Sequence, residues 1–270
     1  RTQQRRTKPH TLPHHLLIAL SCFHSTTTTR GLNIALLTGS TRNSSPPAIL
    51  HPRVNTYIQQ SLRKRGHVVT RIDPIDFVLL EKPHFAYPPG KAPSKLREVH
   101  EILKEADGYV CVTPEYNHSP SPALLNTLNH FGSSAFSFKP SAIVTYSAGQ
   151  WGGTRAAVAL RTTLSELGCL PVSAMIHIPK AQEVLDRDGN IAAVVNTFID
   201  TATSDDDTKE KQQQQQQQQQ HNVERWEKYC GRCFSQLEWW AEATRKHREV
   251  VDPFDESPVF VKTPDQRNAP

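Results

Sequence analysis

The chain has 270 residues, of which 37% are hydrophobic, and its 31 basic and 26 acidic residues give a net charge of +5. The hydrophobic fraction is below the average of globular domains, so we expect one ordered domain with disordered ends and a disordered insert. Five unevenly spaced cysteines argue against a secreted disulfide framework and indicate a reducing compartment, which we take to be the cytoplasm.

The positive charge is concentrated at the start of the chain, where no acidic residue precedes Asp73. Such a field favours an anionic partner. The basic residues follow no helix-turn-helix or zinc-finger pattern, so we expect a phosphate-bearing ligand and no nucleic acid. No apolar run is long enough to cross a bilayer, and we expect no membrane span.

Residues 1–30 are rich in Arg, Thr and His and contain no acid. This composition resembles a mitochondrial targeting peptide, and a disordered extension accounts for it equally well. Both interpretations stay open at this point.

Short apolar runs then alternate with amphipathic segments. The runs predict strands at 32–38, 67–72, 108–114, 139–147 and 170–179. The segments between them predict helices at 53–66, 94–107, 121–131 and 152–168, with Ser94 as the N-cap of the second helix. Strands that alternate with helices predict a parallel α/β sheet with right-handed crossovers.

The alternation stops after residue 200. An acidic stretch and the glutamine run Gln212–Gln220 predict a disordered insert over 201–222. An amphipathic helix at 223–249 then closes the same domain, which we place at 31–200, and residues 250–270 form a Pro-rich tail.

Three predicted strands end in unusual loops, "TGSTRNSS" from 38, "TPEYNHSPSP" from 113 and "YSAGQWGGTR" from 146. Ligands of parallel α/β sheets bind at the carboxyl ends of the strands, where all three loops would meet. Any one of these loops by itself is explained equally well, or better, as a plain turn, a stiff Pro-rich turn or a flexible helix start. Their shared edge favours a binding site.

The first loop has the chemistry of a phosphate site. Gly39 permits a sharp turn, and the hydroxyls of Ser40, Thr41, Ser44 or Ser45 and the Arg42 guanidinium suit a phosphate dianion. The loop matches neither a Walker motif nor a dinucleotide fingerprint, which favours a terminal monophosphate. In the other two loops, Tyr116 beside Asn117 and the glycines around Trp151 suit a planar ligand such as a flavin ring.

With these loops the chain resembles the NAD(P)H-dependent FMN reductases of the flavodoxin-like superfamily, and within them it looks like a fungal-type member. The resemblance rests on "GSTR" at 39–42, "PEYN" at 114–117 and "SAGQWGG" at 147–153, and it covers roughly residues 32–190. It implies a three-layer sandwich with a five-stranded parallel sheet in the order 2-1-3-4-5. It also implies bound FMN, NADPH or NADH as hydride donor, a quinone or free flavin as acceptor, and a homodimer.

By motif position, the resemblance assigns the phosphate to Ser40 and Arg42, the ribityl chain and ring to 114–117, and the pyrimidine end to 149–152. The full set of expected FMN contacts is Ser40, Thr41, Arg42, Pro114, Glu115, Tyr116, Asn117, Ser147, Gly149, Gln150, Trp151, Gly152 and Gly153. Because the flavin would carry the chemistry, we expect no catalytic side chain and no metal.

One departure concerns the phosphate loop. Similar fungal-type sequences run from "STR" almost directly into "PRVN", whereas here residues 43–51 intervene. This removes Ser44 and Ser45 as firm ligands and leaves Arg53 and Asn55 as substitutes. An impaired loop would make the chain a non-catalytic, flavin-binding regulatory protein, which is the alternative to an enzyme.

The pair Cys230 and Cys233 forms a C-x-x-C motif inside the predicted closing helix. A thioredoxin-type site requires a strand before the motif, and no strand is predicted there. A zinc site would need two further ligands. We therefore interpret both cysteines as buried packing residues.

Overall fold

The structure is a computed structural model that describes residues 31–42, 49–193 and 205–253, with side chains in the last range from Gln213 onward. Its strands are β1 (Asn33–Thr38), β2 (Val68–Ile72), β3 (Gly108–Tyr116), β4 (Ser119–Pro120), β5 (Pro140–Tyr146), β6 (Leu170–Pro171) and β7 (Ile176–Ile178). Its helices are α1 (His51–Lys64), α2 (Ser94–Glu105), α3 (Pro122–Asn129), α4 (Ser133–Phe136), α5 (Thr154–Glu166), α6 (Ala181–Val184) and α7 (Asp205–Arg248). Two short 3-10 turns, Pro74–Asp76 and His84–Ala86, lie between β2 and α2.

The sheet has the strand order β2-β1-β3-β5-β6, and β7 continues beside β5. All of these pairs are parallel. The predicted order 2-1-3-4-5 and the flavodoxin-like fold class are therefore confirmed. The last predicted strand, 170–179, divides into β6 and β7, both paired with β5.

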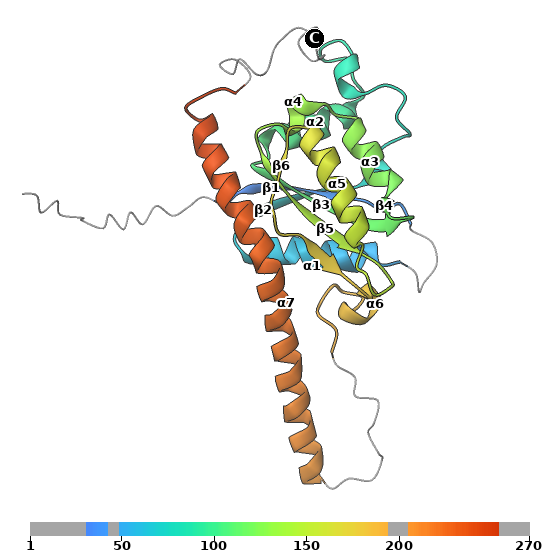
Figure 1. Cartoon of the computed structure of the whole chain (residues 1–270), viewed down its shortest axis with the longest axis vertical. Helices are drawn as coiled ribbons and strands as arrows, with labels where there is room; N and C mark the ends of the chain where they lie inside the picture. The colour runs from blue at the N-terminus through green and yellow to red at the C-terminus, as the bar shows by residue number, and fades with distance from the viewer. Residues whose placement is uncertain (1–30, 43–48, 194–204, 254–270) are drawn as a thin grey trace, which may run out of the picture. The chain divides into compact units, whose positions relative to one another are not determined.

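Helices cover both faces of the sheet, as the nearly all-apolar strands predict (Figure 1). Successive strand residues point to opposite faces. On β3, for example, Val110 packs on the side of α1 and α7, whereas Cys111 packs on the side of α2, α3 and α5. α7 crosses α1 on their common face of the sheet (Figure 1), and the two helices are joined by the ion pair between Lys64 and Glu227 at 2.6 Å.

β3 runs past the edge of the sheet into a short hairpin that the sequence pattern does not predict. Glu115 and Tyr116 pair antiparallel with the two residues of β4. The hairpin turns at Asn117 and His118, whose φ angles are +50° and +64°. Positive φ at both central residues is the geometry that matches the twist of a two-residue hairpin, and Asn tolerates it well. The hairpin fixes Tyr116 at the carboxyl end of the sheet.

The cap of one helix and the start of another differ clearly from the predictions, whereas the starts of α1, α3 and α5 lie within two residues of them. α2 begins at Ser94, but its N-cap is Pro93 and no side chain caps it, so the N-cap assignment of Ser94 is wrong. α7 begins at Asp205 rather than 223, so the glutamine run continues the closing helix. Gln has good helix propensity, and extending a helix avoids the cost of nucleating one. Residues 201–204 lie outside the described part of the chain.

Among the described residues, no helix has the length and hydrophobicity that crossing a membrane requires. The predicted extension at 1–30 and the tail beyond residue 253 lie outside the described ranges.

Candidate functional site

The carboxyl ends of β1, β3 and β5 border a cleft of about 550 Å³, which we call the edge cleft. The order of the sheet reverses here, because β1 and β3 are neighbours while their crossovers lead to opposite sides. The lining residues are Ser40, Arg42, Leu50, His51, Pro114, Glu115, Tyr116, Tyr146, Ser147, Ala148 and Gln182. Six of them were expected from the sequence: Ser40, Arg42, Pro114, Glu115, Tyr116 and Ser147.

The first and second loops are tied together. Ser121 caps the start of α3 by accepting from the Leu124 N–H at 3.2 Å, and its hydroxyl donates to the carbonyl of Gly39 at 2.5 Å. A Cβ on Gly39 would lie 2.7 Å from the Val112 carbonyl oxygen, so the first loop passes too close to β3 for any larger residue. Arg42 extends across the cleft to Tyr116, with its guanidinium carbon 4.7 Å from the ring centre.

The start of α1 adds an imidazole to the first loop. The His51 Nε2 lies 2.7 Å from the carbonyl oxygen of Arg42. A carbonyl can only accept, so Nε2 carries the hydrogen. The first turn of α1 contains no acidic residue and has Pro at its start. Its free N–H groups and the helix dipole therefore favour an anion beside Arg42 and His51.

Glu115 joins the second loop to the third and is not a free acid in the cleft. Its carboxylate accepts from the backbone N–H of Arg155 at 3.1 Å and pairs with the Arg155 guanidinium at 3.0 Å. Burial opposes ionisation of Glu115, but these bonds outweigh it and lower its pKa. The carboxylate thus caps α5 and its charge is balanced within the chain.

The third loop uses its glycines mainly to pack. Gly152 and Gly153 have φ angles of +61° and +81°, and a Cβ on Gly153 would lie 2.7 Å from the Thr145 Cβ. The Gly152 N–H donates to Ser147 Oγ at 3.0 Å, so it is already used within the loop. The Thr145 hydroxyl donates to the Gly152 carbonyl at 2.8 Å and therefore accepts from His177 Nδ1 at 2.8 Å.

The structure does not bring all predicted residues to the edge cleft. Thr41, Gly149, Gln150, Trp151, Gly152 and Gly153 lie in the two loops but are not among the lining residues. Asn117 turns the hairpin and borders a different groove. Arg53 donates to the Leu185 carbonyl at 2.8 Å, and Asn55 is buried, so neither lines the cleft. Ser44 and Ser45 lie outside the described residues.

Five lining residues were missed: Leu50, His51, Tyr146, Ala148 and Gln182. Tyr146 ends β5, and burial raises the pKa of its hydroxyl. A tyrosine at the carboxyl end of an apolar strand, directly before a predicted loop, was a usable signal. Gln182 follows β7 and reaches back to the Ala148 carbonyl at 3.0 Å, a contact that no local pattern reveals.

Cys230 and Cys233 are buried in the interface of α7 with the sheet, as predicted. Burial raises the pKa of each thiol to about 12, so both stay protonated and poor nucleophiles. In the described part of the chain, no cluster of three or more His, Cys, Asp or Glu side chains is arranged to hold a metal ion.

The edge cleft fits a mononucleotide with a planar ring. Its volume is typical of small-molecule sites. One end holds the Arg42 guanidinium with Ser40, His51 and the start of α1 beside it, which suits a phosphate, and Tyr116 offers an aromatic ring next to them. Among the described residues that line the cleft, Glu115 is the one acid, and its charge is balanced by Arg155.

A sequence profile of the family described as NADPH-dependent FMN reductase matches residues 32–183. An NAD(P)H-dependent FMN reductase of Pseudomonas aeruginosa is 34% identical over 103 residues, which are 37% of this chain and 56% of that protein. An NADPH azoreductase of a Bacillus species is 36% identical over 70 residues, 26% of this chain and 39% of that protein. The chain thus spans about half the length of the curated relatives that it matches.

Among solved structures, the flavoenzyme NAD(P)H:(acceptor) oxidoreductase FerB from Paracoccus denitrificans aligns with a TM-score of 0.47 and 21% identity. This alignment covers 73% of the present chain and 98% of that protein. The profile match extends over more than half of the chain and contains every loop of the edge cleft. The chain belongs to the NADPH-dependent FMN reductase family.

Proposed function

We propose that the chain binds FMN in the edge cleft and acts as an NAD(P)H oxidoreductase that reduces a quinone, free flavin or a similar acceptor. The observation that carries this proposal is the pairing of a cationic, donor-rich end with an aromatic wall in one cleft. Family membership and relatives named as FMN, azo and quinone reductases support it.

In this proposal Ser40, Arg42, His51 and the first turn of α1 hold the phosphate. Tyr116 and Pro114 border the ring, and Ser147 and Ala148 lie at its other end. Thr41, Asn117 and residues 149–153 stay predicted contacts, because they lie in the same loops without lining the cleft. Arg53 and Asn55 are not proposed as phosphate contacts, since both are occupied or buried elsewhere.

Bound FMN would supply the hydride chemistry. The side chains of the cleft would orient the flavin and stabilise its phosphate charge, and none is placed as a nucleophile. Tyr146 keeps its proton, because burial raises the pKa of its hydroxyl. Glu115 serves the fold of α5 rather than proton transfer, since its carboxylate is held by Arg155.

The proposal is tested by measuring NADPH and NADH oxidation with 1,4-benzoquinone as acceptor, using protein loaded with FMN. Turnover that requires both FMN and quinone supports the oxidoreductase. Tight FMN binding without turnover with any acceptor would instead support the flavin-binding regulatory protein. Protein that does not bind FMN would contradict both.

We also propose a homodimer formed over the hairpin groove, a depression of about 540 Å³ beside the edge cleft. Leu79 lines this groove and Val78 precedes it in the same loop, and these side chains are 82% and 78% exposed, respectively. Their loop is held in place by Asn126, which accepts from the Leu80 N–H and donates to the Val78 carbonyl. Tyr116 lines both the groove and the cleft, so a second copy seated here would border the flavin.

Sedimentation velocity tests the dimer. Leu79→Asp should convert it to a monomer, whereas Val250→Asp, at an equally exposed valine near the end of α7, should leave it intact.

We further propose that residues 31–200 and the closing helix form one domain that works in a reducing compartment. The free, buried thiols of Cys111, Cys169, Cys230 and Cys233 support the latter.

A further inference from the structure

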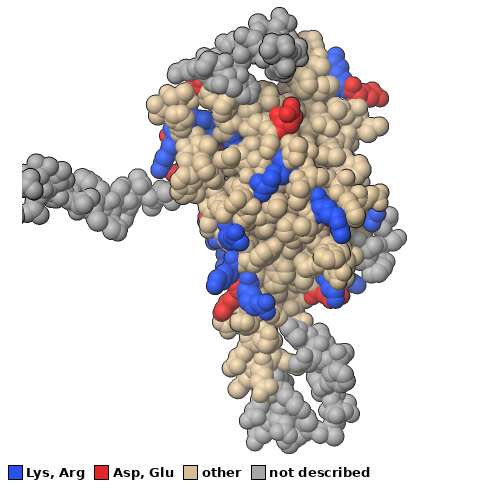
Figure 2. Space-filling view, in the orientation of Figure 1, with Lys and Arg blue, Asp and Glu red and all other residues tan. Residues whose placement is uncertain are grey.

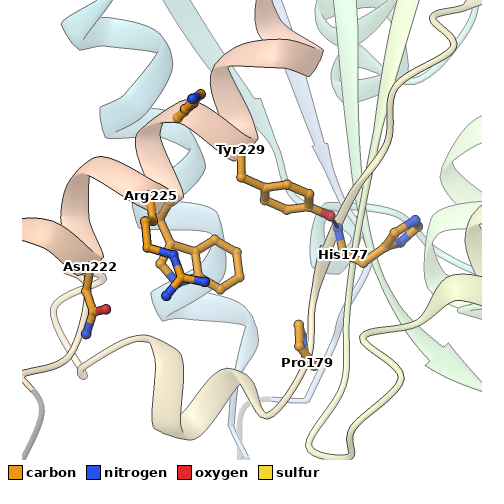
Figure 3. A pocket seen from close by; sticks show the side chains of 7 residues that line it. His177, Pro179, Asn222, Arg225 and Tyr229 are labelled. Atoms are coloured by element: carbon orange, nitrogen blue, oxygen red, sulfur yellow. Dashed lines mark hydrogen bonds between the residues drawn. The ribbon is translucent and has the colours of Figure 1, made fainter.

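A second cavity, distinct from the edge cleft, lies between α7 and the strand β7 with its following turn. We call it the α7 groove. It encloses about 570 Å³ and is lined by His177, Pro179, Asn222, Arg225, Trp226, Lys228 and Tyr229. Figure 3 shows Asn222 and Arg225 on the α7 wall, with Pro179 on the opposite wall. None of these residues lines the edge cleft.

The aromatic wall of the groove is held in position. The Tyr229 hydroxyl accepts from the backbone N–H of His177 at 2.9 Å, which joins α7 to β7 (Figure 3). Trp226 packs against the core on one side and meets Tyr229 edge-to-face, with ring centres 5.6 Å apart at 84°. Two fixed rings that still border open space offer a ready surface for another planar group.

The rim of the groove is cationic, and no described residue supplies a counter-ion to it. Arg225 and Lys228 are exposed and three residues apart on α7, so their like charges are neighbours on the helix surface. Neither makes an ion pair with any described residue, and no acidic side chain among the described residues lines the groove. Figure 2 shows Lys and Arg side chains gathering over α1 and α7.

The nearby acids of α7 are directed elsewhere. Glu227 pairs with Lys64 at 2.6 Å, Glu238 pairs with Arg65, and Glu224 accepts from Gln220 at 3.1 Å. These three acids are thus bonded to α1 or to α7 itself, whereas Arg225 and Lys228 border the groove. Repulsion between Arg225 and Lys228 would be relieved by an anion from outside the chain.

We propose that the α7 groove binds a planar aromatic anion, a one- or two-ring system that carries a carboxylate, sulfonate or phosphate. The rings would stack against Trp226 and Tyr229, and the anion would meet Arg225 and Lys228. The volume fits a small molecule rather than a polypeptide segment. The site is independent of the proposed FMN site.

The groove nonetheless backs onto the third loop of the edge cleft. The segment after β7 supports that loop, because the Lys180 N–H donates to the Gly149 carbonyl at 2.9 Å and the Ala181 N–H to the Ser147 carbonyl at 3.0 Å. A ligand in the α7 groove would therefore contact Pro179, directly before the residues whose N–H groups hold Gly149 and Ser147.

The test titrates naphthalene-2-sulfonate into the FMN-saturated full chain and follows the indole N–H signals of the four tryptophans by NMR, assigned through single Trp→Phe variants. We expect the Trp226 signal to shift while the signals of Trp239 and Trp240 do not. Neutral naphthalene-2-sulfonamide should bind at least tenfold more weakly. Visible absorbance should show that FMN stays bound.

Matched variants distinguish specific binding by the two rim cations from nonspecific attraction of the sulfonate to the positive charge of α7. Arg225→Gln with Lys228→Gln should weaken sulfonate binding at least tenfold, whereas Arg232→Gln, an exposed cation of α7 outside the groove, should leave it within twofold. Equal affinity for sulfonate and sulfonamide, release of FMN, a shift at Trp151 instead of Trp226, or no binding would each overturn the proposal.

Discussion

The two ends of the parallel sheet carry similar charged groups and use them differently. Before the amino ends of β3 and β5, Asp107 accepts from the Asn33 N–H at 2.9 Å and lies 3.7 Å from Arg248. Lys139 donates to the carbonyls of Leu103 and Lys104 there, and burial lowers its pKa to about 7. At the carboxyl ends, Arg42 and His51 instead face a cleft.

This contrast separates charges that hold the fold from charges that are available to a ligand. The groups at the amino end are satisfied within the chain, so their loss should affect stability alone. At the carboxyl end, the Arg42 guanidinium makes no hydrogen bond or ion pair with a described residue, as expected of a group in a binding site. Four variants test this division.

The largest effect should follow Asp107→Ala. It removes the acceptor of the Asn33 N–H and the anion facing Arg248 in a buried network. We expect the free energy of unfolding to fall by about 3 kcal/mol in urea denaturation, with FMN affinity unchanged. Asp76→Ala, which removes an exposed partner of Lys95, should cost less than about 1 kcal/mol. A loss of FMN affinity in Asp107→Ala would contradict the claim that the charged groups at the amino end serve stability alone.

Arg42→Ala should show the opposite pattern. The loss of one charge-assisted contact to a phosphate is worth about 2–3 kcal/mol, so the FMN dissociation constant should rise about 100-fold while stability stays the same. Fluorescence titration of the apoprotein with FMN measures this. Lys91→Ala, an exposed cation outside the cleft, is the control. Equal losses in FMN and riboflavin affinity would show that Arg42 does not meet the phosphate.

Glu115→Gln tests a residue at the carboxyl end that we assign to the fold. It weakens the cap of α5 and removes the ion pair with Arg155. Thermal unfolding should report a loss of about 1 kcal/mol. Glu166→Gln at the other end of α5 should be neutral or slightly stabilising, because an acid there opposes the helix dipole. A strong drop in turnover at unchanged FMN occupancy would instead give Glu115 a role in the chemistry.

The smallest effect concerns pH. Burial opposes ionisation of Glu238, but hydrogen bonds from Arg65 and His67 outweigh it and lower its pKa to about 2. The unfolded chain protonates this Glu at a higher pH than the folded chain does. The contribution of ionised Glu238 to the free energy of unfolding is therefore present in full above about pH 5 and shrinks as the pH falls. The stability difference between the wild-type chain and Glu238→Gln should therefore narrow from pH 5 to pH 3. A difference that stays constant over this range would contradict the assignment.

The sheet was predictable because its strands are apolar on both faces and alternate with amphipathic helices, a pattern that leaves few other topologies. The hairpin at Asn117 and His118 could not be predicted in this way, because it depends on two residues with positive φ and not on periodicity. The helical glutamine run was missed because its composition matches disorder as well as helix. Contact with the domain, such as Gln219 donating to the Ile191 carbonyl at 2.7 Å, decides between them.

For the edge cleft, the strand-end rule predicted the loops that hold Arg42, Tyr116 and Ser147. Gln182 was missed because the turn after β7 brings it in from distant sequence. His51 was missed because the helix was predicted to begin at 53, two residues after it. The glycines at 152 and 153 were predicted as flavin contacts, but they do not line the cleft, and their positive φ and their packing against Thr145 and Pro179 explain them structurally.

The central claim is that Arg42, His51 and Ser40 hold a phosphate beside the ring site. Calorimetric titration of the apoprotein with FMN and with riboflavin tests it most directly, because the two ligands differ only in the phosphate. We predict one FMN per chain and riboflavin bound about 100-fold more weakly or worse. Equal affinities for the two ligands, or no binding of FMN, would contradict the account.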